Sequence, residues 1–201
     1  MNPEVIDQLK TQLGANGLPY GIPIHPNLVH LTLGLFILSI AFDFIGVLLP
    51  IQRPLFKFLA IPTTPSNFFD VGWYNMLASA IITFFTVAVG FYEMMLAEPS
   101  TEVKSAWGLQ AVETMLWHGV GGVFLLALIV GMTIWRGFQR FVWHEDNSQQ
   151  VQLTYLLSGL FIMLLMYVHG TLGAHLAAEF GVHNTADMLL RSGKDFNLLL
   201  K

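Results

Sequence analysis

Three histidines of this chain are each followed by a glycine one helical turn later. The pairs are His30 with Gly34, His118 with Gly122, and His169 with Gly173. Residues four apart share one face of a helix, so each imidazole is expected to lie beside a patch without a side chain. A flat macrocycle bound through imidazole needs such clearance, and neutral imidazole is a ligand of haem iron. The spacing favours a haem site, although small residues also let membrane helices approach closely.

The segments that carry these histidines are too apolar for a water-soluble domain. Of the 201 residues, 54% are hydrophobic and 11% are charged, whereas about a quarter of the residues in a soluble domain are charged. The chain has no cysteine, which excludes disulfides, iron–sulfur clusters, thiolate zinc sites and thioether-linked haem. The net charge of −4 is small and no run of like charges occurs, so nucleic acid is not an expected partner. The expected environment is the lipid bilayer.

Four apolar runs are long enough to cross a bilayer as helices, which takes about 20 residues. They cover residues 28–49, 71–97, 111–135 and 151–178. We therefore predict an all-α fold, an integral membrane four-helix transmembrane bundle with both termini on the same side, here called side A.

The predicted membrane domain covers residues 27–180. Residues 1–26 are expected to form an N-terminal interfacial segment, and residues 181–201 a C-terminal tail with a short surface helix from Thr185 to Leu190. Pro50 is expected to end the first helix, and the proline-interrupted residues 52–70 to form an interfacial loop.

Antiparallel threading of the four spans places six polar groups at a similar depth, near side A. These are His25, His30, Glu93, His118, His169 and His175. Asp43 lies roughly 20 Å further toward the opposite side, side B, as an isolated buried acid, and His144 falls in a side B turn. Because ionisable groups inside a bilayer are costly, each is a functional candidate.

The function predicted from this cluster is that of a b-type cytochrome-like protein. His30 and His118 are the preferred ligands of haem b, and His169 is the main substitute. Glu93 is expected to orient a ligand or handle a proton. Three further candidates for such supporting roles are His25, His175 and Asp43. The role would be that of an electron carrier or a subunit of an electron-transport complex, not a self-contained enzyme.

Two alternatives remain open. The first is a His/Glu metal site without porphyrin, in which His30, His118 and His169 bind the ion. Against it, no two of the candidate ligands have the i, i+3 or i+4 spacing of familiar helical metal sites. The second is a non-catalytic accessory or assembly subunit of a larger membrane complex, whose histidines serve contacts between helices.

Basic residues near the span ends are more numerous on side B, where Arg53, Lys57, Arg136 and Arg140 lie. The positive-inside rule therefore predicts that loops 50–70 and 136–150 are cytoplasmic.

The segment Ile24-His25-Pro26-Asn27-Leu28-Val29-His30, followed by an apolar span with Asp43, resembles the opening motif of a prokaryotic membrane family. This is the uncharacterised family catalogued as domain of unknown function 2231. The resemblance continues through Gly90-Phe-Tyr-Glu93, His118 and Gly170-Thr-Leu-Gly173-Ala-His175-Leu to Phe180-Gly181-Val182. It covers about residues 24–182.

The resemblance implies a four-helix membrane domain in a prokaryotic inner or thylakoid membrane. Because members can occur beside redox modules, it also favours electron transfer. The expected partner is a redox partner or a larger membrane complex, and in the accessory-subunit alternative a photosynthetic complex is one candidate. The family pattern includes His25, His30 and His118 but neither His169 nor His175. Glu93 stands where the family usually has aspartate, which keeps the carboxylate but lengthens its side chain.

Overall fold

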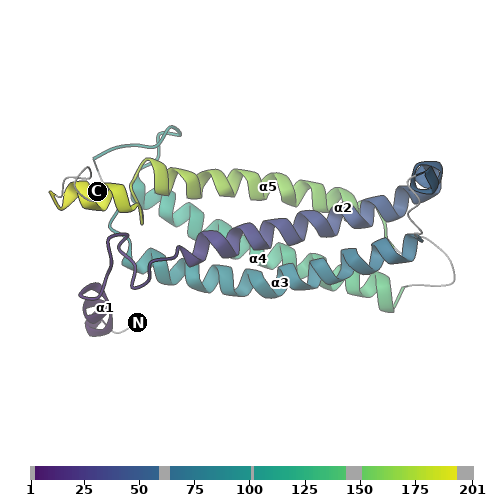
Figure 1. Ribbon diagram of the computed structural model, residues 1–201, viewed down its shortest axis with the longest axis horizontal. Helices are drawn as coiled ribbons and strands as arrows, with labels where there is room; N and C mark the ends of the chain where they lie inside the picture. Colours follow the sequence, from purple (N-terminus) through teal and green to yellow (C-terminus); the bar gives the residue numbers. More distant parts are fainter. Residues whose placement is uncertain (1–2, 59–63, 101, 144–150, 194–201) are drawn as a thin grey trace. The chain divides into compact units, whose positions relative to one another are not determined.

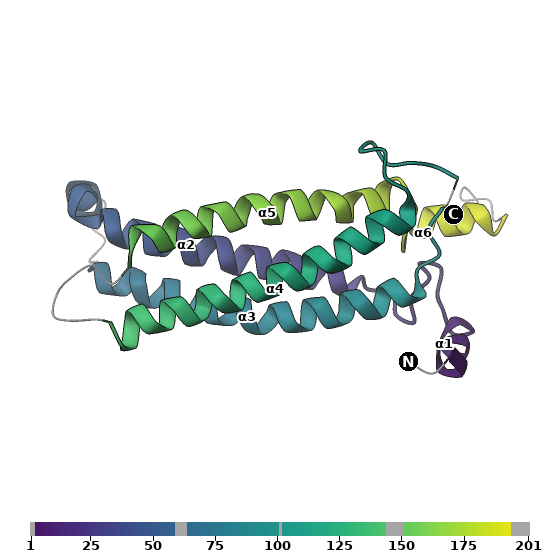
Figure 2. The same ribbon diagram turned by 180° about the vertical axis from the view of Figure 1, so that it is seen from behind.

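The computed structural model describes residues 3–58, 64–100, 102–143 and 151–193. Within these ranges the fold is all-helical, without named strands (Figures 1 and 2). The helices are α1 (Pro3–Lys10), α2 (Ile24–Phe58), α3 (Pro65–Leu96), α4 (Ala111–Phe141), α5 (Leu153–Ala178) and α6 (Thr185–Arg191).

Four of these helices are long and apolar enough to span a membrane. The spans are Ile24–Leu48, Pro65–Leu96, Ala111–Phe141 and Leu153–Ala178. Large apolar side chains such as Phe84, Phe85 and Phe161 are exposed on them, which suits helices whose outer surface contacts lipid rather than water. The four predicted spans are confirmed.

The loop predicted for residues 52–70 is wrong. Helix α2 continues through Pro50 to Phe58, and α3 already begins at Pro65. Proline fits the first turn of a helix because its missing N–H is not needed there, which explains the start at Pro65. An interior proline bends a helix rather than always ending it, and the last part of α2 turns away from its first part (Figure 1).

The chain divides into two compact units, and each long helix contributes to both. Unit 1 contains residues 1–26, 87–122 and 168–201, whereas unit 2 contains residues 27–86 and 123–167.

Unit 2 holds the larger apolar core, built around side chains such as Phe36, Met76, Ile129 and Tyr155. Hydroxyl groups connect its helices as well. The Thr32 and Thr86 hydroxyls lie 3.0 Å apart, and Ser79 Oγ donates to the Thr32 carbonyl. Such hydrogen bonds are typical of helix contacts in membranes, where water does not compete for them.

Unit 1 has a smaller core of Ala111, Leu176 and Phe180. Its short helix α6 confirms the predicted surface helix. Asn184 caps α6, because its side-chain oxygen accepts hydrogen bonds from the backbone N–H groups of Ala186 and Asp187.

Candidate functional site: a histidine cluster in unit 1

Three imidazole rings from three helices are in contact in unit 1. His118 of α4 and His169 of α5 are stacked with their ring centroids 4.3 Å apart and their planes only 4° from parallel. His25, at the start of α2, lies edge-on to His118 at 6.0 Å. Threading of the spans predicts His118 and His169 at one depth, and the structure brings their rings together.

Each ring of this cluster packs against a glycine of another helix. A Cβ atom on Gly90 would lie 2.6 Å from His25 Cε1, and one on Gly173 would lie 3.0 Å from His118 Cε1. On α4, a Cβ on Gly121 would lie 2.7 Å from His169 Nδ1, and one on Gly122 would lie 3.9 Å from the same ring. Any side chain at Gly90 or Gly121 would collide with an imidazole.

These contacts correct the interpretation of the glycine spacing. The space at Gly173 and Gly122 is not open clearance beside the histidine of the same helix, because the imidazole of a neighbouring helix fills it. Only Gly34 of the three predicted glycines has nothing within 4 Å of a Cβ position. Its companion His30 is exposed on α2, so the half-buried cluster contains His25 rather than His30.

Two nitrogens of the stacked pair are buried without a hydrogen-bond partner in the described part of the chain. They are His118 Nδ1 and His169 Nδ1. Leaving a buried donor or acceptor unsatisfied costs about 1–3 kcal/mol, and most such groups in folded proteins find a partner. The stacked pair is therefore a candidate site, although the side chains of Gln139 and Tyr155 also contain buried atoms without a partner among the described residues.

Glu93 holds the N-terminal segment against the end of α3. Its buried carboxylate oxygen Oε1 accepts a hydrogen bond of 2.7 Å from the Tyr20 hydroxyl and one of 3.1 Å from the backbone N–H of His25. Burial, followed by the hydrogen bond to Glu93, raises the pKa of Tyr20 above its ordinary value. Glu93 thus positions the backbone of His25. Tyr20 has no recognisable signal in the sequence.

His175 belongs to a separate set of contacts in unit 1. Its Nδ1 lies 2.9 Å from Glu179 Oε2, and its ring packs edge-on against Trp107 at 5.1 Å. The same Glu179 oxygen accepts a hydrogen bond from the backbone N–H of Ala106. His175 therefore helps to dock the connector between α3 and α4.

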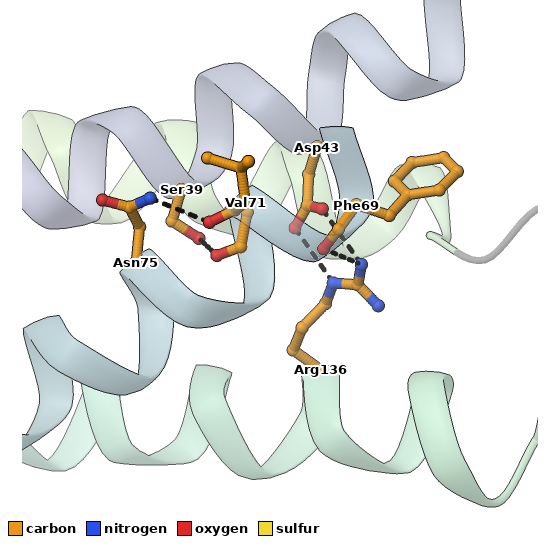
Figure 3. Close-up of polar contacts among 7 residues, drawn as sticks. Ser39, Asp43, Phe69, Val71, Asn75 and Arg136 are labelled. Atoms are coloured by element: carbon orange, nitrogen blue, oxygen red, sulfur yellow. Dashed lines mark hydrogen bonds and ion pairs between the residues drawn. The ribbon is translucent and has the colours of Figure 1, made fainter. Parts of the chain in front are cut away.

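Asp43 is not isolated, contrary to the prediction. In unit 2 it forms a two-point ion pair with Arg136 of α4, with both N–O distances 3.0 Å and both side chains fully buried (Figure 3). The Phe69 carbonyl accepts a further bond of 3.4 Å from Arg136. Gly72 leaves room for the carboxylate, since a Cβ there would collide with it. Arg136, predicted to begin a loop, lies inside α4.

The remaining predicted groups do not form a metal centre in the described part of the chain. Within these residues, no group of three or more His, Asp or Glu side chains is arranged to hold a metal ion. The side B histidine, His144, lies outside the described residues.

Comparisons with known proteins identify the family of the chain. Neither the curated proteins nor the solved structures include a match to the chain. Residues 21–186 match the model of a family described as "Predicted membrane protein (DUF2231)". Because the match extends from the N-terminal segment through all four spans, the chain belongs to this membrane protein family.

Proposed function

We propose that the protein binds haem b in the membrane and serves in electron transfer, with His118 and His169 as the iron ligands. The observation that carries the proposal is the half-buried pair of imidazoles whose buried Nδ1 atoms have no hydrogen-bond partner among the described residues. Bundle cores with histidines on facing helices are common sites for such cofactors. When bound, haem supplies one-electron chemistry.

Haem iron suits this donor set better than a bare metal ion. A structural or catalytic zinc ion takes at least three protein ligands, and no such group occurs among the described residues. Haem iron needs only one or two protein ligands, because the porphyrin supplies the others. Glu93 is not proposed as a ligand, since its carboxylate binds Tyr20 and the backbone of His25.

The donor atoms fit haem iron, but the space between the two rings does not. Centroids 4.3 Å apart put the imidazoles in van der Waals contact, which leaves no room for a porphyrin between them. The proposal therefore requires that His118 and His169 separate when haem binds. His25 would then lie beside the site as a group that orients the His118 ring.

The close stacking favours a second candidate function, that of an accessory subunit without a cofactor. In that case His118 and His169 serve only the packing of α4 against α5, with Gly121 and Gly173 giving the rings room. Such a protein would be defined by its association with a larger membrane complex.

The experiment is to purify the protein from membranes of cells supplied with haem precursor, record its visible spectrum and measure its metal content. We expect a Soret band, split α and β bands on reduction, and iron in proportion to the Soret band. A bound metal without porphyrin absorbance would overturn the haem proposal in favour of a bare metal site. Absence of both, with co-purification of a large complex, would favour the accessory subunit.

A further inference from the structure

His183 bridges two backbone carbonyls from separate parts of unit 1. Its Nε2 lies 2.9 Å from the carbonyl oxygen of Glu93, and its Nδ1 lies 3.2 Å from the carbonyl oxygen of Asn16. The first carbonyl belongs to the last turn of α3. The second belongs to the loop between α1 and α2. One half-buried imidazole thus connects both segments to the turn that precedes α6.

Both acceptors constrain the protonation state of His183. A carbonyl oxygen can only accept, so each ring nitrogen needs a hydrogen to bond to it. Neutral imidazole carries a hydrogen on one nitrogen, whereas the imidazolium cation carries one on each. The two contacts can therefore both be hydrogen bonds only when His183 is protonated.

The backbone at His183 is held in an unusual conformation to make this bridge. Its φ of 54° makes it the non-glycine residue with positive φ in the described part of the chain. This left-handed region is disfavoured for residues with a Cβ and persists where surrounding contacts impose it. Gly17, which follows Asn16 in the loop that His183 contacts, also has a positive φ, of 71°. A Cβ atom added to Gly17 would lie 2.8 Å from Met188 Sδ.

The Asn16 loop offers a fixed acceptor. Asn16 Oδ1 accepts from the backbone N–H of Leu18, and Asn16 Nδ2 donates to the carbonyl of Tyr20. These two hydrogen bonds stabilise the conformation of the loop, so the carbonyl that His183 contacts has a fixed position.

The charges around His183 are compatible with a cation. The carbonyl end of a helix favours positive charge, and His183 lies at that end of α3. On the same helix end, the Glu93 carboxylate accepts from Tyr20. On α6, Asp187 pairs with Arg191.

A separate ion pair connects helix α1, which precedes this loop, to the chain just beyond α3. Lys10 of α1 lies 3.5 Å from Glu98, just beyond the end of α3, and both side chains are largely exposed. Such an exposed pair contributes little to stability, so it does not replace the His183 bridge.

We propose that His183 is a pH-sensitive latch that holds the N-terminal segment 14–23 against the end of α3. When His183 is protonated, it donates hydrogen bonds to both carbonyls and holds segment 14–23 against the end of α3. As pH rises and the proton is lost, one ring nitrogen faces a carbonyl without a hydrogen between them. That contact then becomes repulsive, so the latch is strong at low pH and weakens as pH rises through the range in which histidine titrates.

The test is hydrogen exchange of segment 14–23 in the full chain in lipid nanodiscs, corrected for intrinsic exchange, between about pH 5.5 and about pH 8. For the natural sequence we expect exchange to be about threefold to tenfold faster at the higher pH, as the loss of one hydrogen bond implies. Exchange that does not change with pH would overturn the proposal.

His183→Asn is the informative variant, because asparagine tolerates a positive φ but does not titrate. We expect fast, pH-independent exchange of segment 14–23 in this variant. His175→Asn is the matched control, since it removes another imidazole from the same unit and should leave the pH dependence unchanged. The assignment to His183 would be overturned if the exchange of segment 14–23 still depended on pH in His183→Asn, or if this pH dependence were lost in His175→Asn. Unchanged exchange of the α4 and α5 amides checks that each variant is folded.

Discussion

In unit 2, the buried charges of Asp43 and Arg136 satisfy each other through two hydrogen bonds of 3.0 Å. The stacked His118–His169 pair of unit 1, by contrast, has buried Nδ1 atoms without a hydrogen-bond partner among the described residues. Breaking the ion pair would leave an uncompensated charge in a low-dielectric region, so unit 2 depends on its polar groups for stability. The unsatisfied Nδ1 atoms of His118 and His169 are expected to lower the free energy of unfolding. The charges of the Asp43–Arg136 pair are thus satisfied within the protein, whereas the two imidazole nitrogens of unit 1 are not.

The largest expected effect comes from breaking the ion pair. Arg136→Met leaves the Asp43 carboxylate buried and unpaired, and should lower the free energy of unfolding by about 3–5 kcal/mol. Denaturant-induced unfolding of the protein in a mild detergent measures this free energy. The double variant Asp43→Leu with Arg136→Met removes both charges and should be more stable than Arg136→Met alone. If the two substitutions simply add, the pair is not the stabilising unit of this region.

The next largest effect tests whether the histidine cluster is tightly packed. Gly90→Ala and Gly121→Ala place a methyl group 2.6 Å from His25 Cε1 and 2.7 Å from His169 Nδ1, and each should destabilise the protein by about 1–3 kcal/mol. Gly34→Ala is the matched control, because nothing lies within 4 Å of its Cβ position. Thermal unfolding of the three variants gives the comparison. Equal stability of Gly90→Ala and Gly34→Ala would mean that the ring positions in unit 1 are loosely held.

A smaller effect is expected from Tyr20→Phe, which removes one of two hydrogen bonds to Glu93 Oε1. We expect a loss of about 1 kcal/mol, together with faster amide exchange at His25. Asn75→Ala is a suitable control in unit 2, since Asn75 is half-buried and its side-chain amide donates to the Val71 carbonyl of its own helix (Figure 3). If Tyr20→Phe leaves exchange at His25 unchanged, the Glu93 contacts do not position this histidine.

The smallest effect is a gain in stability in unit 2. The side-chain nitrogen and oxygen of Gln139 are both buried without a hydrogen-bond partner among the residues that the structure describes, so Gln139→Leu should raise the free energy of unfolding by about 1 kcal/mol. Thr133→Val, at a buried site where the hydroxyl already bonds to the Ile129 carbonyl, should give no such gain. A clear loss of stability in Gln139→Leu would show that Gln139 has a role the described contacts do not explain.

The sequence was sufficient to predict the four spans and the shared level of His118 and His169 on α4 and α5, because both follow from the length of apolar runs. It was not sufficient to predict how each helix is rotated about its axis. His25 and His30 lie near the same end of α2, yet His25 reaches the cluster through its contacts with Gly90 and Glu93, and His30 is exposed. These contacts between distant segments have no local pattern in the sequence.

The Asp43–Arg136 pair illustrates the same difficulty. Arg136 follows an apolar run that ends at Trp135, so the hydropathy of the sequence places Arg136 in a loop. The structure extends α4 to Phe141 and buries the guanidinium against α2. A search for opposite charges at equal depth on antiparallel spans would have paired the two residues.

The proposal that His118 and His169 bind haem iron is tested most directly by the absorption spectra of four proteins purified in parallel. These are the natural sequence and the variants His118→Ala, His169→Ala and His30→Ala. The account predicts a Soret band in the natural protein and in His30→Ala, and its loss or a marked shift in the other two variants. A Soret band that disappears in His30→Ala but persists in His118→Ala and His169→Ala would contradict it, as would the absence of any Soret band in the natural protein.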